Sequence, residues 1–204
     1  MSVAGSLARQ LAEPTGLAGR AIGAAMDIAN RRPTRLAIDL LAPMDEENIL
    51  DAGCGTGAAM AEVLRRAHCR LVGIDRSVAM VAAAERRLGP SATVREARIE
   101  DLPFPAQSFH AVIALNIFYF CDPDSAMICT LRRVLRPEGR LVAYVTHRDT
   151  MRNWSFTREG YHRLFDEEAL VSAIMAGGFA RDGICVETVT IARGVKGLLA
   201  LARC

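Results

Sequence analysis

The chain has 204 residues, of which 51% are hydrophobic, and this composition argues against a disordered protein. Its formal net charge is only +2, which argues against nucleic acid as a partner. Its longest apolar run, 111–121, is interrupted by Asn116 and falls well short of the ~20 residues that span a membrane, so we expect no membrane contact. None of the six cysteines has a partner at C-x-x-C spacing and the first residues lack a secretory signal, so we expect a cytoplasmic protein with reduced thiols and no metal site.

Residues 1–47 are predicted to be helical, with breaks at 14–16 and at Pro33, where glycine or proline interrupts the pattern. The apolar residues of 17–30 recur at helical spacing and give that segment one apolar face. We therefore expect a helical cap over 1–47 in front of an α/β core over 48–204, the two forming a single domain.

From Asn48 onward, short apolar runs alternate with helical segments. The runs predict strands at 48–52, 70–74, 92–97, 109–117, 140–146, 184–192 and 195–202. Helices are expected at 56–67, 77–88, 123–135 and 167–176, with Ser77 as an N-cap. Strands that are apolar on both faces and separated by helices are typical of a covered parallel sheet. The fold class is therefore α/β, a doubly wound, Rossmann-like, seven-stranded and mostly parallel sheet with helices on both faces and extra N-terminal helices.

The first predicted strand ends in the glycine-rich turn Asp51-Ala52-Gly53-Cys54-Gly55-Thr56-Gly57 and leads into a helix. In such a sheet ligands collect beyond the carboxyl ends of the strands, where glycines allow a ligand to approach the backbone closely. On spacing alone, residues 53–58 with Asp75 also fit the dinucleotide fingerprint. Asp51 favours a different ligand, because a carboxylate repels a pyrophosphate but attracts an ammonium group, such as the one in S-adenosylmethionine.

Several motifs, in order between about residues 48 and 142, resemble those of the class I S-adenosylmethionine-dependent methyltransferases. They are Ile49–Gly57, Leu71–Ser77, Glu100–Pro105 followed by Ser108-Phe109, Phe109–Ile117 and Leu131–Leu141. The resemblance implies an enzyme that uses S-adenosyl-L-methionine, with the methionine part of the cofactor in the first motif. It also implies that Asp75 binds both ribose hydroxyls, since a carboxylate can accept two hydrogen bonds from a diol.

The resemblance assigns cofactor contacts to residues spread along these motifs. They are Asp51, Gly53, Cys54, Gly55, Gly57, Asp75, Arg76, Met80, Glu100, Asp101 and Asn116. Three positions depart from the family pattern. Arg98 stands where many relatives have an acid that accepts the adenine amino group, so Glu100 or backbone carbonyls must replace it. His110 replaces the usual Asp and is expected to be structural, and the Cys54 side chain is expected to pack rather than react.

Methyl transfer requires alignment of an acceptor with an already activated methyl group, so proximity can supply most of the acceleration. A general base helps a hydroxyl or a protonated amine, and His147, after the fifth parallel strand, is the candidate catalytic residue. Substrate contacts are expected from Tyr119, beyond the fourth strand, and from Trp154 and Tyr161 in the aromatic-rich segment 151–165. That segment would form a lid or a wall of the acceptor pocket.

The stretch Asn116–Tyr119 resembles the N-P-P-Y motif of enzymes that methylate planar amino groups, but both prolines are missing. With no basic tail, the chain is expected to methylate a small molecule, as a monomer or a homodimer. Two alternatives stay open: a methyltransferase acting on RNA or protein and, with less support, a nicotinamide-dependent oxidoreductase. The accepting atom, the use of a base and the oligomeric state are not determined by the sequence.

Overall fold

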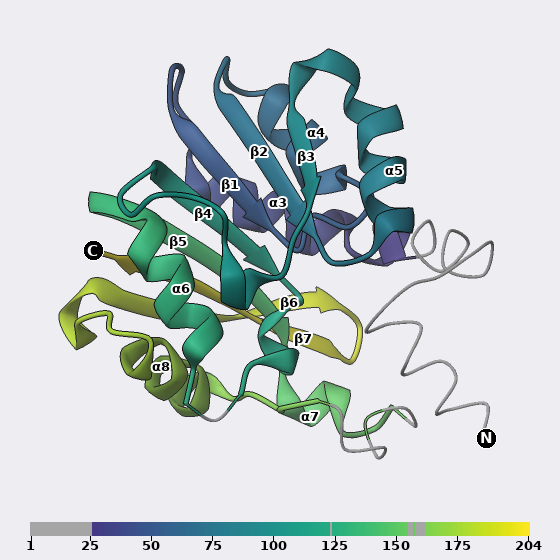
Figure 1. The fold of residues 1–204 in the computed structure, drawn as a ribbon. Helices are drawn as coiled ribbons and strands as arrows, with labels where there is room; N and C mark the ends of the chain where they lie inside the picture. The colour runs from purple at the N-terminus through teal and green to yellow at the C-terminus, as the bar shows by residue number, and fades with distance from the viewer. Residues whose placement is uncertain (1–25, 123, 155–156, 158–161) are drawn as a thin grey trace.

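The computed structural model describes residues 26–122, 124–154, 157 and 162–204 (Figure 1). Its helices are α3 (Arg31–Leu41), α4 (Ala58–Leu64), α5 (Val78–Leu88), α6 (Ala126–Val134), α7 (Arg148–Met151) and α8 (Glu167–Ala176). Its strands are β1 (Asn48–Ala52), β2 (Arg70–Asp75), β3 (Thr93–Glu96), β4 (Phe109–Leu115), β5 (Leu135–Thr146), β6 (Ile184–Ala192) and β7 (Val195–Arg203). Short 3-10 turns include η2 (Ile99–Asp101) and η3 (Phe118–Phe120).

The strands form one seven-stranded sheet in the order β3-β2-β1-β4-β5-β7-β6. The first five strands in that order pair in parallel, whereas β7 runs antiparallel to both β5 and β6. The order reverses between β1 and β4, and a doubly wound sheet opens a crevice at such a point, beyond the carboxyl ends of its strands. The predicted Rossmann-like, mostly parallel sheet is confirmed.

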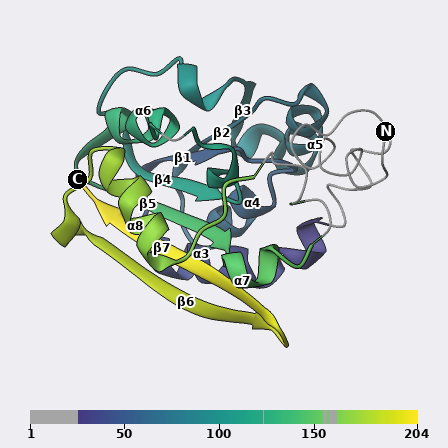
Figure 2. The ribbon, with the colours of Figure 1, turned by 90° about the horizontal axis from the view of Figure 1, so that it is seen from below.

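Helices cover both faces of the sheet, with α3 on one side and α6 on the other (Figures 1 and 2). Ile38 of α3 packs in the core beneath one face, which also contains Ile113 of β4. Ile128 of α6 packs in the core on the other face, together with Val112 of β4. This alternation explains why the strand segments are apolar on both faces. None of the described helices is both long and apolar enough to cross a membrane.

Two of the boundaries that differ from the prediction have a clear physical reason. The helix break expected at Pro33 lies at Asn30, and Pro33 sits in the first turn of α3, where its missing N–H costs no helical hydrogen bond. β5 begins at Leu135, inside the helix and turn expected there, because Leu135 pairs with Phe109 before the register shifts. Tertiary pairing has thus overridden the local turn signal.

The start of α5 matches the prediction because its cap is local. The Ser77 side chain accepts a hydrogen bond from the amide of Met80 and so satisfies one of the unpaired N–H groups of the first turn. Ser77 also donates its own amide to Asp75 Oδ1 at 2.8 Å. The helix start is therefore fastened to the end of β2, which is part of the rim of the crevice.

Candidate functional site

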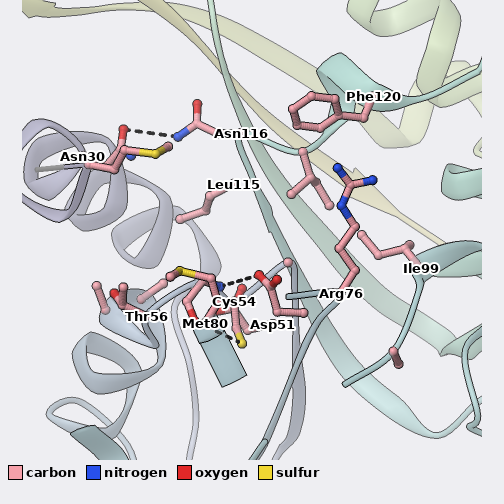
Figure 3. Close-up of a pocket in the computed structure, with 18 of the residues that line it drawn as sticks. Asn30, Asp51, Cys54, Thr56, Arg76, Met80, Ile99, Leu115, Asn116 and Phe120 are labelled. Carbon is pink, nitrogen blue, oxygen red and sulfur yellow. Dashed lines mark hydrogen bonds between the residues drawn. The ribbon is translucent and has the colours of Figure 1, made fainter. Parts of the chain in front are cut away.

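A cavity of about 340 Å³ lies at the carboxyl ends of β1, β2 and β4, where the strand order reverses (Figure 3). This volume is in the range of small-molecule sites. The described residues of its wall are Met26, Asp27, Asn30, Thr34, Asp51, Gly53, Cys54, Gly55, Thr56, Ala58, Ala59, Asp75, Arg76, Met80, Ala97, Arg98, Ile99, Glu100, Leu115, Asn116, Ile117, Phe120, Asp122 and Met127.

Three glycines in left-handed backbone conformations shape the turn after β1. Their φ angles are +75° at Gly53, +54° at Gly55 and +76° at Gly57. Residues that carry a side chain rarely adopt such angles. A Cβ at Gly53 would lie 2.5 Å from Cγ2 of Ile117, so the turn and the end of β4 meet there without room for a side chain. At Gly55 nothing lies within 4 Å of the Cβ position. The turn thus leaves its middle glycine open to a ligand.

Asp51 is a buried carboxylate in the cavity wall. Its side chain is 2% exposed, and its Oδ2 has no hydrogen-bond donor among the residues that the structure describes. Burial, with a smaller contribution from repulsion by Asp75, raises the pKa of Asp51 to about 7. An unpaired carboxylate in such a place costs free energy, and a cationic ligand group would remove that cost. This part of the cavity therefore favours a cation.

Asp75, at the end of β2, is held by two backbone amides. Its Oδ2 accepts a hydrogen bond from Gly55 at 2.9 Å and its Oδ1 accepts one from Ser77 at 2.8 Å. Burial raises the pKa of Asp75, and these two hydrogen bonds counteract that rise. Each oxygen keeps a further lone pair, so the fixed carboxylate can still accept hydrogen bonds from a ligand diol.

Beyond β2 and β3 the cavity wall changes to flat and apolar groups. The Arg76 guanidinium lies over the Phe120 ring, 5.7 Å from its centroid, and points toward Phe120 and Ile99 (Figure 3). Arg98 Nε lies 3.7 Å from Glu100 Oε2, and both residues line the cavity. A stacked cation and an aromatic ring beside an aliphatic side chain suit a flat ring system.

Two asparagines from distant parts of the chain meet on the opposite side of the cavity. Asn116, just after β4, has a φ of +59° and donates a hydrogen bond from Nδ2 to Asn30 Oδ1 at 3.2 Å. The buried Tyr119 hydroxyl donates to Asn116 Oδ1 at 3.0 Å. Asn30 precedes α3, so the N-terminal helical segment completes the cavity wall.

Asp27 fastens that N-terminal segment to the glycine turn. It accepts a hydrogen bond from the Thr56 hydroxyl at 2.6 Å and forms an ion pair with Arg87 of α5, also at 2.6 Å. Arg87 in turn donates to the Thr56 hydroxyl at 2.7 Å. Three elements, one of them from the predicted cap, are thus joined at the edge of the cavity.

Most of the residues assigned to the cofactor line this cavity. They are Asp51, Gly53, Cys54, Gly55, Asp75, Arg76, Met80, Glu100 and Asn116. Gly57 instead packs against α5, where a Cβ would lie 3.0 Å from Leu88, and Asp101 is exposed in η2. Burial raises the pKa of the Cys54 thiol, so this side chain packs as an uncharged group. Contact of each of these residues with a cofactor stays a prediction.

None of the described residues assigned to catalysis or to the substrate lines the cavity. His147 is 8% exposed and caps α7, because its Nδ1 accepts a hydrogen bond from the Asp149 amide at 3.1 Å. Tyr119 is buried and Trp154 is partly exposed, and neither lines the cavity. Tyr161 lies outside the described residues. Their proposed roles stay predictions, and the geometry gives His147 a capping role.

Sequence reasoning missed part of the cavity wall. The wall residues without an assigned contact include Asp27, Thr34, Ile99, Leu115, Ile117, Asp122 and Met127. Most of them are apolar, and an apolar residue near a strand end looks in sequence like any core residue. Asp27 had one usable signal, since it is the acidic residue of an otherwise apolar helical segment, but its partners lie 29 and 60 positions away.

Part of the chain is similar to curated methyltransferases. Residues 49–139 match a family model described as a methyltransferase domain. The chain is 29% identical over 121 residues to an O-methyltransferase of Aspergillus sclerotiorum, covering 57% of this chain and 46% of that protein. It is 34% identical over 109 residues to demethylmenaquinone methyltransferase of Tropheryma whipplei, covering 53% and 45%. It is 30% identical over 161 residues to malonyl-[acyl-carrier protein] O-methyltransferase of Enterobacter lignolyticus, covering 74% and 63%. The chain spans about half the length of the first two relatives.

Solved structures share the fold at low sequence identity. Burkholderia thailandensis 1,6-didemethyltoxoflavin-N1-methyltransferase matches with a TM-score of 0.70 and 20% identity, covering 91% of this chain and 81% of that one. Geranyl diphosphate methyltransferase matches with a TM-score of 0.68 and 17% identity, covering 84% of each chain. The [4+2]-cyclase SpnF matches with a TM-score of 0.66 and 19% identity, covering 84% and 80%. Because one of these proteins is a cyclase, the function has to be argued from the site.

Proposed function

Because the chain belongs to the class I S-adenosylmethionine-dependent methyltransferases, we propose that it transfers a methyl group from S-adenosylmethionine to a small-molecule acceptor. The observation that carries this proposal is Asp51, a buried carboxylate with an unpartnered oxygen in the cavity wall. The ammonium group of the cofactor would give that oxygen its missing donor. The pyrophosphate of a nicotinamide cofactor would instead face a like charge, which disfavours the oxidoreductase alternative.

We assign the parts of the cofactor to successive stretches of the cavity wall. Asp51 and the glycine turn hold the amino-acid part, and the open Cβ position at Gly55 leaves room for it. The Asp75 carboxylate, pinned by two amides, accepts the ribose hydroxyls. Arg76 and Ile99 enclose the adenine ring, since they bound the flat and apolar part of the cavity.

The chain contributes alignment and exclusion of water more than acid–base chemistry. The bound cofactor supplies a methyl group that its sulfonium already activates. Among the described residues of the cavity wall there is no histidine, and the titratable groups are carboxylates, arginines and the Cys54 thiol, which burial keeps uncharged. Holding an acceptor against the methyl group is the largest contribution that such a wall can make.

The size of the cavity and the names of two similar proteins support a small acceptor. A volume of about 340 Å³ must hold the cofactor, so little room is left for an acceptor inside the described wall. Demethylmenaquinone and 1,6-didemethyltoxoflavin, named in the descriptions of two similar proteins, are small molecules. We further propose that residues 1–47 act as a cap of the same domain, which agrees with Met26 and Asn30 lining the cavity.

The test has two steps. Calorimetry with S-adenosylmethionine, S-adenosylhomocysteine, NAD and NADP identifies the cofactor, and binding of a nicotinamide cofactor alone would refute the proposal. Asp51→Asn is the matched control, because it keeps the shape of the side chain and removes the charge. A screen with methyl-labelled S-adenosylmethionine against small molecules, RNA and proteins then identifies the acceptor class. Label transferred to RNA or protein alone would refute the small-molecule acceptor.

A further inference from the structure

A directed chain of hydrogen bonds runs from β5 to the cavity. The amide of Thr146 donates to the Tyr119 hydroxyl, and that hydroxyl donates to Asn116 Oδ1 at 3.0 Å. Asn116 Nδ2 then donates to Asn30 Oδ1 at 3.2 Å. Burial raises the pKa of Tyr119, so its hydroxyl keeps the proton that it donates.

This chain fixes which way the Asn116 side-chain amide points. The Tyr119 hydroxyl accepts from the backbone amide of Thr146, so its own proton needs an acceptor, and Asn116 Oδ1 lies at hydrogen-bond distance from it. A flipped amide would turn two oxygens, one from Asn116 and one from Asn30, toward each other. The backbone of Asn116 is also fixed, because its amide donates to the Tyr144 carbonyl at 2.8 Å.

The backbone conformation of Asn116 supports a role at the site. Its φ of +59° is uncommon for a residue with a side chain, although asparagine tolerates this conformation better than most. Such conformations cluster at functional sites, where the surrounding structure holds them. Hydrogen bonds hold the side-chain amide of Asn116 from both sides, so this residue of the cavity wall has one fixed orientation.

The result is a cavity wall that carries hydrogen-bond donors. An asparagine amide has two N–H bonds, and only one of those on Asn116 is used by Asn30. Asn30 accepts through its oxygen, so its own Nδ2 adds further donors to the same wall. In Figure 3 this pair lies across the cavity from Asp51 and Cys54. Donors thus face a carboxylate that lacks a partner.

An amino-acid group satisfies both sides at once, because its ammonium and its carboxylate are attached to the same carbon. The two arginines of the cavity wall are engaged elsewhere: Arg76 lies over the ring of Phe120, and Arg98 is near the carboxylate of Glu100. The asparagine pair is an uncharged donor set that lies across the cavity from Asp51.

We propose that Tyr119 is a positioning residue that locks the Asn116 amide, so that Asn116 and Asn30 donate hydrogen bonds to the carboxylate of the bound cofactor. The proposal rests on the proposed function and deepens it. Tyr119 acts from behind the wall and does not touch the cofactor. The locked amide makes the site selective for an intact amino-acid group over an amine that lacks the carboxylate.

Calorimetry on the full chain tests this with two ligands. One is S-adenosylhomocysteine, and the other is its decarboxylated analogue, in which a 3-aminopropyl thioether replaces the homocysteine part. We expect Tyr119→Phe to lower the affinity for S-adenosylhomocysteine roughly ten-fold, because a hydrogen bond to a charged group is weakened. The affinity for the analogue should not change. Ser108→Ala is the control, because it also removes a hydroxyl, which donates to the Pro105 carbonyl, and because Ser108 precedes β4, at the end of that strand opposite the cavity. It should leave both affinities unchanged.

A second variant, Asn116→Asp, keeps the size of the side chain and its tolerance for the left-handed conformation. It replaces the donor by a charged oxygen that repels a ligand carboxylate, so binding of S-adenosylhomocysteine should weaken more than in Tyr119→Phe, whereas the analogue, which has only the ammonium group, should not bind more weakly. If both variants lower the affinity for the two ligands equally, the positioning role is refuted. If the unmodified chain binds neither S-adenosylhomocysteine nor S-adenosylmethionine, the proposed function itself has failed.

Discussion

The cavity has two walls that are built in different ways. The first, here called the turn wall, consists of Asp51, Gly53, Gly55 and Asp75 and comes from two adjacent strand ends and a single tight turn. The second, here called the asparagine wall, consists of Asn30 and Asn116 and joins residues 86 positions apart in the chain. Backbone hydrogen bonds hold the first wall, whereas side-chain hydrogen bonds hold the second.

The difference matters for function because it separates two tasks. Turn geometry is prescribed by local sequence, so the first wall suits the common part of a cofactor. The asparagine wall depends on how the N-terminal segment docks, so it can change without any change in the sheet. We expect substitutions in the turn wall to abolish or weaken binding generally, and those in the asparagine wall to alter ligand selectivity.

The largest loss of stability and of cofactor binding is expected from a substitution at Gly53, where the turn wall meets the end of β4. Gly53→Val would place a side chain 2.5 Å from Ile117 at a φ of +75°. Overpacking and backbone strain each cost ~1–3 kcal/mol, so several kcal/mol of stability should be lost along with cofactor binding. Denaturant unfolding and calorimetry measure both. Gly194→Val is the control, because its φ is also positive but nothing lies within 4 Å of its Cβ position. Equal losses in the two variants would contradict the steric argument.

Most of the turn wall could be predicted from the sequence, and the reason is physical. Most contacts that shape it lie within a strand end, its turn or the next strand, so glycine spacing and two acids sufficed to predict it, whereas the approach of Ile117 to Gly53 had no such local signal. His110 was likewise expected to be structural, and its Nδ1 accepts from the Asn48 amide at 2.9 Å. In the asparagine wall, Asn116 was predicted as a cofactor contact, but its pairing was not, because neither Asn30 nor Tyr119 carries a local signal of the partner it meets. The aromatic content of 151–165 suggested a substrate wall, but Trp154 does not line the described cavity.

Within the turn wall, Asp75 should have the next largest effect. Asp75→Ala removes an acceptor for the ribose hydroxyls, so cofactor affinity should fall by ~1.5–3 kcal/mol, the value of hydrogen bonds to a charged group. The change also frees the amides of Gly55 and Ser77, so the Tm has to be followed alongside calorimetry. Asp182→Ala serves as the control, since this acid is exposed and does not line the cavity. An unchanged affinity in Asp75→Ala would contradict the ribose assignment.

Asp51 makes the turn wall sensitive to pH. Because burial raises the pKa of Asp51 from 3.8 to about 7, its contribution to stability is present below the lower value and is lost as the pH rises through the higher one. Relative to Asp51→Asn, the ligand-free protein should therefore lose stability between about pH 4 and about pH 7. Denaturant unfolding of both proteins across this range provides the measurement.

Ligand affinity should change with pH in the opposite direction. An ammonium group pairs with the ionised carboxylate, so cofactor affinity should rise by up to roughly ten-fold per pH unit below about 7 and flatten above it. Asp51→Asn should remove most of this slope. A slope that survives in the variant would assign the titration to another group, of which Asp75 is the nearest candidate, since its pKa is also raised by burial.

The smallest effect concerns His147, which belongs to neither wall. Its Nδ1 accepts from the Asp149 amide, and an N-cap is worth about 1 kcal/mol. His147→Ala should therefore lower the free energy of unfolding by about that amount, with cofactor affinity unchanged. His147→Asn should retain the stability, because asparagine caps helices well. Once an acceptor is found, a capping role predicts that the asparagine variant keeps its rate of methyl transfer. A general base at this position predicts that both variants lose it, which would extend the active site toward α7.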